Sequence, residues 1–188
     1  KDKTVVSNNS GDKTPKEVGQ ISKEKKQYRN RVIRAWAKRN DVSLDNIKNG
    51  RAVSDFVKGG AKANRIKGGE EVIDLKDVER SFEKIVSGKE KVKKGSFYTP
   101  KYIVREILNR CFNRVKGRGI ESPTVCDPAC GSGGFLVESV EMLSKRFDVT
   151  PREVVEENIF GIDVDAMAIK HAKALIELYL ASEGVTLP

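Results

Sequence analysis

The sequence between residues 124 and 143 changes from a short apolar run to a glycine-rich turn and then to a helical pattern. Thr124, Val125 and Cys126 are typical of a buried parallel strand, and Asp127 stands where that strand should end. The glycines that follow permit backbone torsions and a close ligand approach that a Cβ would block. Ligands of open α/β sheets bind beyond the carboxyl ends of the strands, so the turn predicts a ligand site. The next apolar residues recur at helical spacing: Phe135, Leu136, Val137, Val140 and Leu143.

Two common nucleotide motifs do not fit this turn. A P-loop requires lysine and then serine or threonine after its glycines, but Phe135 follows Gly134 here. A dinucleotide fingerprint that began at Gly131 would need its third glycine at Leu136. The acid ahead of the glycines instead favours a ligand that presents a cation or an amine donor.

Two motifs carry a family resemblance. Residues 127–136 read Asp-Pro-Ala-Cys-Gly-Ser-Gly-Gly-Phe-Leu, and residues 97–100 read Phe-Tyr-Thr-Pro. Together they resemble the S-adenosylmethionine site of N6-adenine DNA methyltransferases, especially the type I modification subunits and fused type IIG enzymes of restriction–modification systems. The resemblance covers about residues 95–182. It implies methylation of adenine in duplex DNA, with S-adenosylmethionine as cofactor and specificity or restriction subunits as candidate partners.

The cofactor has groups that these residue types can bind. Asp163, which should end a second strand, can accept hydrogen bonds from both ribose hydroxyls, and Asp127 can accept from the ammonium group. The Thr99 hydroxyl and amides at a helix start can bind the carboxylate. Asp165 is expected instead to cap the helix that begins at Ala166. With the resemblance, the predicted cofactor-binding residues are Phe97, Tyr98, Thr99, Pro100, Asp127, Pro128, Ala129, Gly131, Ser132, Gly133 and Asp163.

The predicted fold is α/β, with a partial Rossmann-like S-adenosylmethionine-dependent methyltransferase domain after a basic, mostly helical region. Strand, helix, strand and helix in that order are half of a doubly wound domain, with the second strand expected at 159–165. We expect Thr99 and Thr150 to cap helices that begin at the following prolines. The predicted segments are a disordered basic arm (1–20), a helical region (21–93, with helices at 23–39, near 53–57 and at 75–87) and the truncated methyltransferase domain (94–188).

The family's catalytic motif, Asn/Asp-Pro-Pro-Tyr/Phe, has no counterpart here. That motif holds and stacks the flipped adenine, and no Pro-Pro pair occurs in the sequence. No residue is therefore assigned as catalytic. Because the chain begins at Lys1 and ends at Pro188, where a third strand is expected, we expect a fragment that holds the first half of the cofactor site and is inactive alone.

The positive charge of the chain lies in its first half. Residues 1–97 hold 25 Lys and Arg against 14 Asp and Glu, a net +11, whereas residues 98–188 hold 11 against 13, a net −2. This asymmetry predicts a nucleic-acid partner or, alternatively, a solubilising arm. Methylation of RNA or protein, and a non-catalytic nucleic-acid-binding role, also stay open. Candidate DNA contacts on the polar side of the Trp36 helix are Arg29, Arg31, Arg34, Lys38 and Arg39.

Cysteine and apolar content indicate a cytoplasmic protein without a membrane segment. Three cysteines do not suggest a disulfide framework, and no apolar run approaches the length of a membrane span. Cys126 and Cys130 lack the partners of a metal site and are predicted to be small buried thiols. Trp36 is predicted to be a core residue. His171, between Lys170 and Lys173, is predicted to face solvent without a chemical role.

Overall fold

A computed structural model of the protein describes residues 15–44, 51–57, 74–83 and 99–185, and the side chains of residues 15–22 are not described. The predictions for Phe97, Tyr98 and a domain boundary near residue 94 therefore lie outside the described residues. The elements, in chain order, are α1 (Pro15–Arg39), α2 (Ala52–Val57), α3 (Leu75–Glu83), α5 (Lys101–Lys116), β1 (Val125–Asp127), α6 (Gly134–Phe147), α7 (Pro151–Glu153), the π-helical η2 (Val154–Asn158), β2 (Ile159–Gly161) and α8 (Ala166–Ser182).

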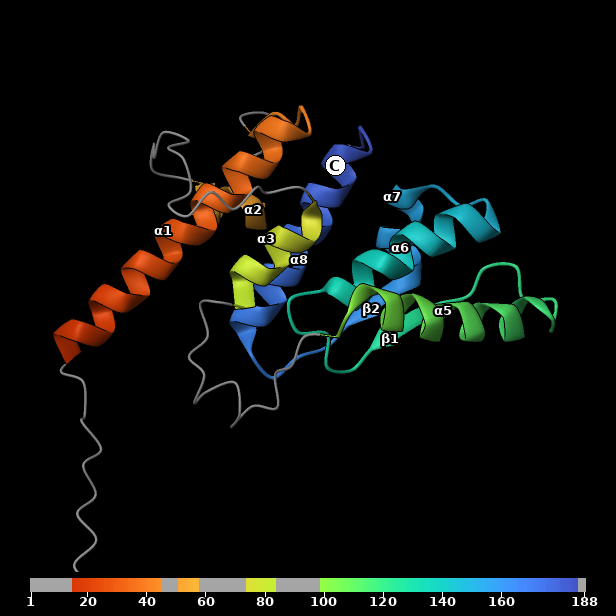
Figure 1. Ribbon diagram of the computed structural model, residues 1–188. Coiled ribbons are helices and arrows are strands. Elements are labelled where there is room, and N and C mark those ends of the chain that lie inside the picture. Colours follow the sequence, from red (N-terminus) through yellow and green to blue (C-terminus); the bar gives the residue numbers. More distant parts are fainter. Residues whose placement is uncertain (1–14, 45–50, 58–73, 84–98, 186–188) are drawn as a thin grey trace, which may run out of the picture.

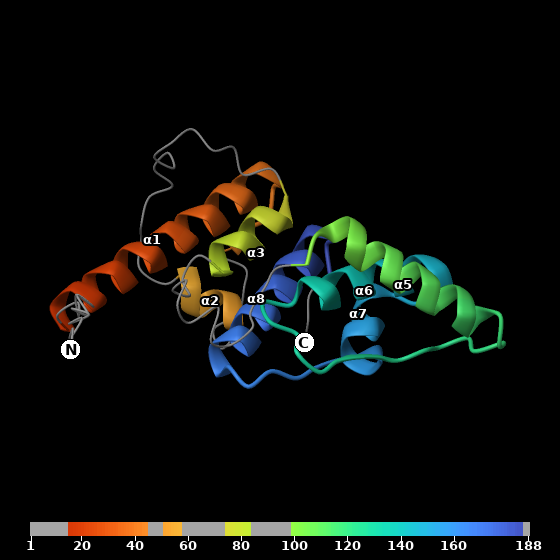
Figure 2. The ribbon, with the colours of Figure 1, turned by 60° about the horizontal axis from the view of Figure 1, so that its bottom comes forward.

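The N-terminal helices pack as a bundle on α8. Helix α1 lies against α2 and α3, which in turn contact α8, and α8 also contacts α6 (Figures 1 and 2). Trp36 is only 2% exposed in this bundle, which confirms it as a core residue. None of the helices among the described residues has the length and apolar character needed to cross a bilayer.

Helix α1 begins earlier than the sequence pattern predicted. We expected disorder up to residue 20 and a helix from residue 23, but the helix starts at Pro15. Proline suits the first helical position because its missing N–H would have no partner there and its φ is already helical. The apolar periodicity that located the helix begins later, at Tyr28, so it marked only the packed part.

Arg29 does not lie on the polar side of α1, where it was predicted to contact DNA. Its side chain is buried, and its guanidinium carbon lies 4.0 Å from the centroid of the Phe56 ring. Burial lowers the pKa of Arg29 to about 10. Of the other candidates, Lys38 and Arg39 are exposed, whereas Arg31 and Arg34 are half-buried. The basic surface of α1 is therefore smaller than the sequence suggested.

The α/β part has the predicted parallel pairing. Strands β1 and β2 run parallel, with Val125 opposite Ile159 and Cys126 opposite Phe160. Helix α6 lies against both strands, and α5 packs along α6 (Figure 1). A second apolar core forms between α5 and α6 and includes Leu108, Phe112 and Leu143. The chain is thus mostly helical with a small parallel sheet, which confirms an α/β fold.

Only one face of the sheet is covered by the described residues. Successive strand residues point to opposite faces, and α6 packs on the face of Val125 and Ile159. Cys126 and Phe160, on the opposite face, are exposed. The prediction that Cys126 is a buried thiol is therefore wrong, whereas Cys130 is buried as predicted.

Helix starts follow the predicted chemistry in two of three cases. Thr150 caps α7, since its side chain accepts from the backbone N–H of Glu153 at 3.2 Å. Asp165 caps α8, because its carboxylate accepts from the Met167 N–H at 2.9 Å. At α5 the cap residue is Pro100 rather than Thr99, and no side chain bonds to the helix start. The Thr99 hydroxyl is thus not used as a cap.

Candidate functional site

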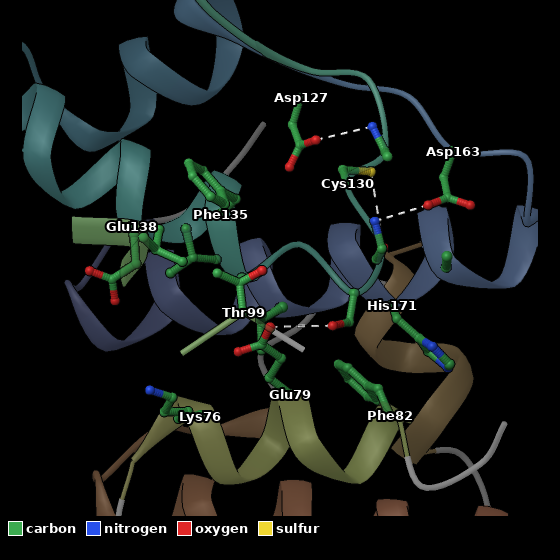
Figure 3. A pocket seen from close by; sticks show the side chains of 18 of the residues that line it. Lys76, Glu79, Phe82, Thr99, Asp127, Cys130, Phe135, Glu138, Asp163 and His171 are labelled. Carbon is green, nitrogen blue, oxygen red and sulfur yellow. Dashed lines mark hydrogen bonds between the residues drawn. The ribbon is translucent and has the colours of Figure 1, made fainter. Parts of the chain in front are cut away.

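A cavity of about 650 Å³ lies beside the glycine turn, at the carboxyl ends of the two strands (Figure 3). This volume lies within the range of small-molecule sites. Its walls are α3, the start of α5, the glycine turn with α6, and the segment from the end of β2 into α8. Polar residues of the wall include Asp74, Lys76, Glu79, Thr99, Lys101, Asp127, Ser132, Glu138, Glu141, Asp163, Asp165 and His171.

Asp163 fastens the glycine turn to the segment that follows β2. Its Oδ2 accepts from the Gly131 N–H at 2.9 Å (Figure 3). Its Oδ1 accepts from the Asp165 N–H at 2.8 Å. A backbone bond from Cys130 N–H to the Ile162 carbonyl, at 2.9 Å, strengthens the same connection. Asp163 therefore has a structural role that the sequence analysis did not anticipate.

Asp127 begins the turn. Its Oδ1 accepts from the Ala129 N–H at 3.0 Å, and its backbone carbonyl accepts from the Ile162 N–H at 2.9 Å. The bond from Ala129 holds the Asp127 carboxylate at the start of the turn, on the same side of the cavity as Asp163 (Figure 3). The two strand ends thus bring the two predicted acids together.

The glycines of the turn serve different purposes. Gly131 and Gly133 have φ values of +53° and +91°, which side chains disfavour. A Cβ at Gly131 would meet open space, but one at Gly133 would lie 2.7 Å from the Ala172 Cα. Gly133 therefore allows α6 and α8 to approach closely, rather than allowing a ligand to approach.

Ion pairs cover the α5 side of the cavity. Arg105 donates to Glu138 at 2.7 Å and to Glu141 at 2.8 Å, and Lys101 pairs with Glu138. Burial tends to raise the pKa of Glu141, but hydrogen bonds from Lys145 and Arg105 outweigh it and hold that pKa at about 2. Glu138 and Glu141 thus both pair with basic side chains of α5, and Glu141 also pairs with Lys145 on the next turn of α6.

Most of the predicted cofactor-binding residues that the structure describes lie around this cavity. Two do not line it: Gly133, which packs on Ala172, and Pro100, which begins α5. Phe97 and Tyr98 lie outside the described residues. The predicted residues that do line the cavity are Thr99, Asp127, Pro128, Ala129, Gly131, Ser132 and Asp163.

Helix α3 is a wall of the cavity that the sequence analysis missed. Leu75, Glu79 and Phe82 all line the cavity, at the spacing of one helix face. The sequence offered one signal, because Glu79 is an acid on a face that is otherwise apolar. Glu79 is half-buried and accepts from the Ser132 hydroxyl at 3.4 Å.

His171 is buried, which contradicts the prediction that it faces solvent. It is 3% exposed, and its ring stacks on Phe82 at 4.4 Å between centroids with an interplanar angle of 1°. Burial, together with the charge of Arg29, lowers the pKa of His171 to about 4. Its Nε2 has no hydrogen-bond partner among the described residues. The prediction was wrong because it relied on the flanking lysines Lys170 and Lys173. His171 lies instead on the side of α8 that faces α2 and α3.

We expect Cys130 to be the unreactive thiol of the three. Burial and the nearby charges of Asp127 and Asp163 raise its pKa to about 11, whereas Cys111 and Cys126 are exposed. A rise of this size leaves about 100-fold less thiolate near pH 8 than an unperturbed thiol has. Iodoacetamide should therefore label Cys111 and Cys126 first, as measured by peptide mass spectrometry. Equal labelling of Cys130 in the folded protein would contradict this, and equal labelling in guanidinium is the control.

Comparison with known proteins gives a consistent set of relatives. A family model described as N-6 DNA Methylase matches residues 79–180. The type II methyltransferase M.VspI of Vibrio sp. (strain 343) is 30% identical over 96 residues, which are 51% of this chain and 20% of the relative. The type I restriction enzyme MjaIX methylase subunit of Methanocaldococcus jannaschii is 33% identical over 79 residues, 42% of this chain and 12% of the relative.

A third relative is the adenine-specific methyltransferase BrxX of Escherichia coli O9:H4 (strain HS). It is 40% identical over 55 residues, which are 26% of this chain and 5% of the relative. The matched segments of these relatives thus span at most a fifth of their lengths. No solved structure is significantly similar to the chain. The family match begins within α3, so it includes part of the region that was predicted to precede the methyltransferase domain.

Proposed function

Because the chain belongs to the N-6 DNA methylase family, we propose that it carries the S-adenosylmethionine site of a DNA adenine-N6 methyltransferase of a restriction–modification system. The observation that supports this most is the cavity at the ends of two parallel strands, where Asp127 and Asp163 flank the glycine turn. Acids at these strand ends fit a Rossmann-like methyltransferase domain. Duplex DNA is the proposed substrate, specificity or restriction subunits are proposed partners, and the cytoplasm is the proposed location.

The cavity fits this cofactor in size and charge. S-adenosylmethionine has an ammonium and a sulfonium group against a single carboxylate, so it is a net cation. The cavity wall holds seven carboxylates: Asp74, Glu79, Asp127, Glu138, Glu141, Asp163 and Asp165. Against these acids the wall holds the basic side chains of Lys76 and Lys101. A cationic ligand is therefore favoured over a phosphate.

The residues of the turn would bind and orient the cofactor, which supplies the methyl group when it is bound. Each oxygen of Asp163 accepts one backbone N–H and keeps a second lone pair, which can accept from a ribose hydroxyl. The second oxygen of Asp127 can accept from the ammonium group. The Thr99 hydroxyl, which does not cap α5, can donate to the carboxylate.

Substitution of Asp163 by alanine is expected to weaken S-adenosylmethionine binding by about 1–3 kcal/mol, the cost of losing a charged hydrogen-bond partner. Isothermal titration calorimetry on the complete protein and its Asp163→Ala variant would measure this. Because both Asp163 oxygens also accept backbone N–H bonds that hold the turn, urea denaturation of the variant is the control: it shows whether weaker binding accompanies a loss of the fold. Unchanged binding by Asp163→Ala would contradict the ribose role.

The acceptor can be tested separately with the complete protein and a radiolabelled methyl donor. We expect transfer to the adenine amine of duplex DNA. An amine whose lone pair is delocalised into the ring requires extrusion of the base and polar acceptors around it. Transfer to RNA or protein, with none to duplex DNA, would overturn the proposed substrate.

A further inference from the structure

Four charged side chains join α5 to α6 beside the cavity. Lys101 and Arg105 are one turn apart on α5, so they lie on one face of that helix. Glu138 and Glu141 are likewise one turn apart on α6. The Nε of Arg105 donates to Glu138 at 2.7 Å, and its Nη2 donates to Glu141 at 2.8 Å. Lys101 pairs with Glu138, and its Nζ lies 3.7 Å from a carboxylate oxygen of Glu141. Each basic residue therefore contacts both glutamates.

This network determines how α5 lies along α6. The apolar contacts of Val104, Leu108 and Phe112 hold the middle of α5 in the second core, but such contacts have no preferred direction. The two bonds of the Arg105 guanidinium do have a direction, because a forked donor fits its acceptors in one geometry. A rotation of α5, or a shift along its axis, would break both bonds. The apolar contacts thus hold the two helices together, whereas the ion pairs fix their relative position.

Burial distinguishes this network from an ordinary surface ion pair. Glu138 is only 7% exposed, so leaving its carboxylate without a partner would cost free energy. On the outer side of the same helix, Arg110 donates to Glu106 at 2.7 Å, but these side chains are 80% and 57% exposed. Water screens such an exposed pair, and it contributes little. Arg105 is therefore expected to constrain α5, whereas Arg110 is not.

The start of α5 is the part of the helix that reaches the cavity. Thr99, Lys101 and Val104 line the cavity, and Figure 3 shows Thr99 and Glu138 among the side chains around it. Thr99 comes two residues before the first residue of α5, so its position follows the position of the helix start. Arg105 lies one turn farther along and does not line the cavity. It can therefore affect a bound ligand without contacting it, through the residues that it positions.

We propose that Arg105 is a positioning residue for the cofactor: its bonds to Glu138 and Glu141 hold the start of α5 where the Thr99 hydroxyl can donate to the cofactor's carboxylate. This rests on the proposed function, in which Thr99 binds that carboxylate. The cavity wall holds seven carboxylates against two basic side chains, so it repels an anionic group that has no donor aimed at it. Accurate placement of Thr99 is what makes the carboxylate end of the ligand acceptable there.

The test is a double-mutant cycle with Arg105→Ala and Thr99→Ala in the complete protein, measured by isothermal titration calorimetry. S-adenosylhomocysteine has the carboxylate, whereas 5′-S-(3-aminopropyl)-5′-thioadenosine keeps the amine and lacks the carboxylate. We expect each single variant to bind S-adenosylhomocysteine about tenfold more weakly, the loss of one hydrogen bond to a charged group. The double variant should lose no more than either single variant, because both substitutions remove the same contact. Binding of the second ligand should not change.

Two further variants serve as controls. Arg110→Ala is the matched control, because it removes the same charge and one exposed ion pair from the same helix, and it should leave both affinities unchanged. Arg105→Lys keeps the charge but replaces the forked guanidinium by a single amine. It should bind S-adenosylhomocysteine with an affinity between those of the wild type and Arg105→Ala, and it takes the place of the alanine variant in the cycle if urea denaturation shows that variant to be unfolded.

Unchanged binding of S-adenosylhomocysteine by Arg105→Ala would overturn the proposal. So would equal weakening of both ligands, or losses that add to about 100-fold in the double variant, because Arg105 would then act independently of Thr99. If the wild type bound both ligands equally well, the carboxylate contact would be absent, and this inference would fail while the cofactor site remained. If the wild type bound neither ligand, the proposed function itself would fail.

Discussion

Substitution of Gly133 by alanine is expected to lower the free energy of unfolding by about 4 kcal/mol, which combines an unfavourable positive φ with a steric conflict in a packed interior. The φ of Gly133 is +91°, and an added Cβ would lie 2.7 Å from the Ala172 Cα. The obstacle is backbone of α8, so no rotation of a side chain can relieve it. Urea denaturation followed by circular dichroism would measure the change.

The neighbouring glycines provide the controls for this prediction. Gly131→Ala meets open space at φ +53° and should cost only about 1 kcal/mol, the price of a left-handed alanine. Gly134→Ala meets only the flexible end of Glu79, so its effect on stability should be small. Equal losses at residues 131 and 133 would show that backbone conformation, rather than contact between α6 and α8, explains the motif.

Acidification from pH 7 to pH 4.5 is expected to lower the stability of the protein by about 2.5 kcal/mol through His171 alone, at 1.36 kcal/mol for each unit of pKa difference. The pKa of His171 is about 4 when folded, below the ordinary 6.5. Between these values the unfolded state binds a proton that the folded state does not, so stability is complete above pH 6.5 and falls with pH. Denaturant titrations at several pH values would measure the slope.

His171→Phe tests this assignment. It is the only histidine of the chain, so the variant should lose the slope between pH 6.5 and 4.5. The depressed pKa of Glu141, about 2, removes stability only as pH falls below the ordinary glutamate range. Glu141→Gln should therefore leave the upper part of the profile unchanged. A slope that persists in His171→Phe would contradict the buried, neutral state of His171.

Helix α8 carries Ala172 and His171, the residues on which the Gly133 and pH predictions depend, and it also forms part of the cavity wall. One part of α8 contacts the glycine turn through Ala172, and the adjacent His171 stacks on Phe82 of α3. Farther along, the carboxylate of Glu177 accepts from the backbone N–H groups of Ala52 and Val53 at the start of α2. The helical region and the α/β part therefore share one helix, which explains how an acid of α3 reaches the cavity.

Local sequence patterns determined the elements and the end of β1 at Asp127, whereas β2 ends at Gly161, four residues before the predicted end of the second strand. Each short apolar run, followed by an acid and a helical period, predicted strand, turn and helix, because hydrophobic spacing reports the local conformation directly. The cap at Asp165 and the adjoining positions of Asp127 and Asp163 followed from the same rules. For residues 75–87 the period also predicted α3, of which the structure describes Leu75–Glu83.

Tertiary structure alone decided which faces meet. Arg29 and His171 each have basic or polar neighbours in the sequence, yet both are buried because α1, α2, α3 and α8 close around Phe56 and Phe82. Cys126 is exposed since α6 covers the other face of the sheet. The contact of Glu79 with Ser132 spans 53 residues. Such contacts depend on how whole elements dock, and no periodicity within one element contains that information.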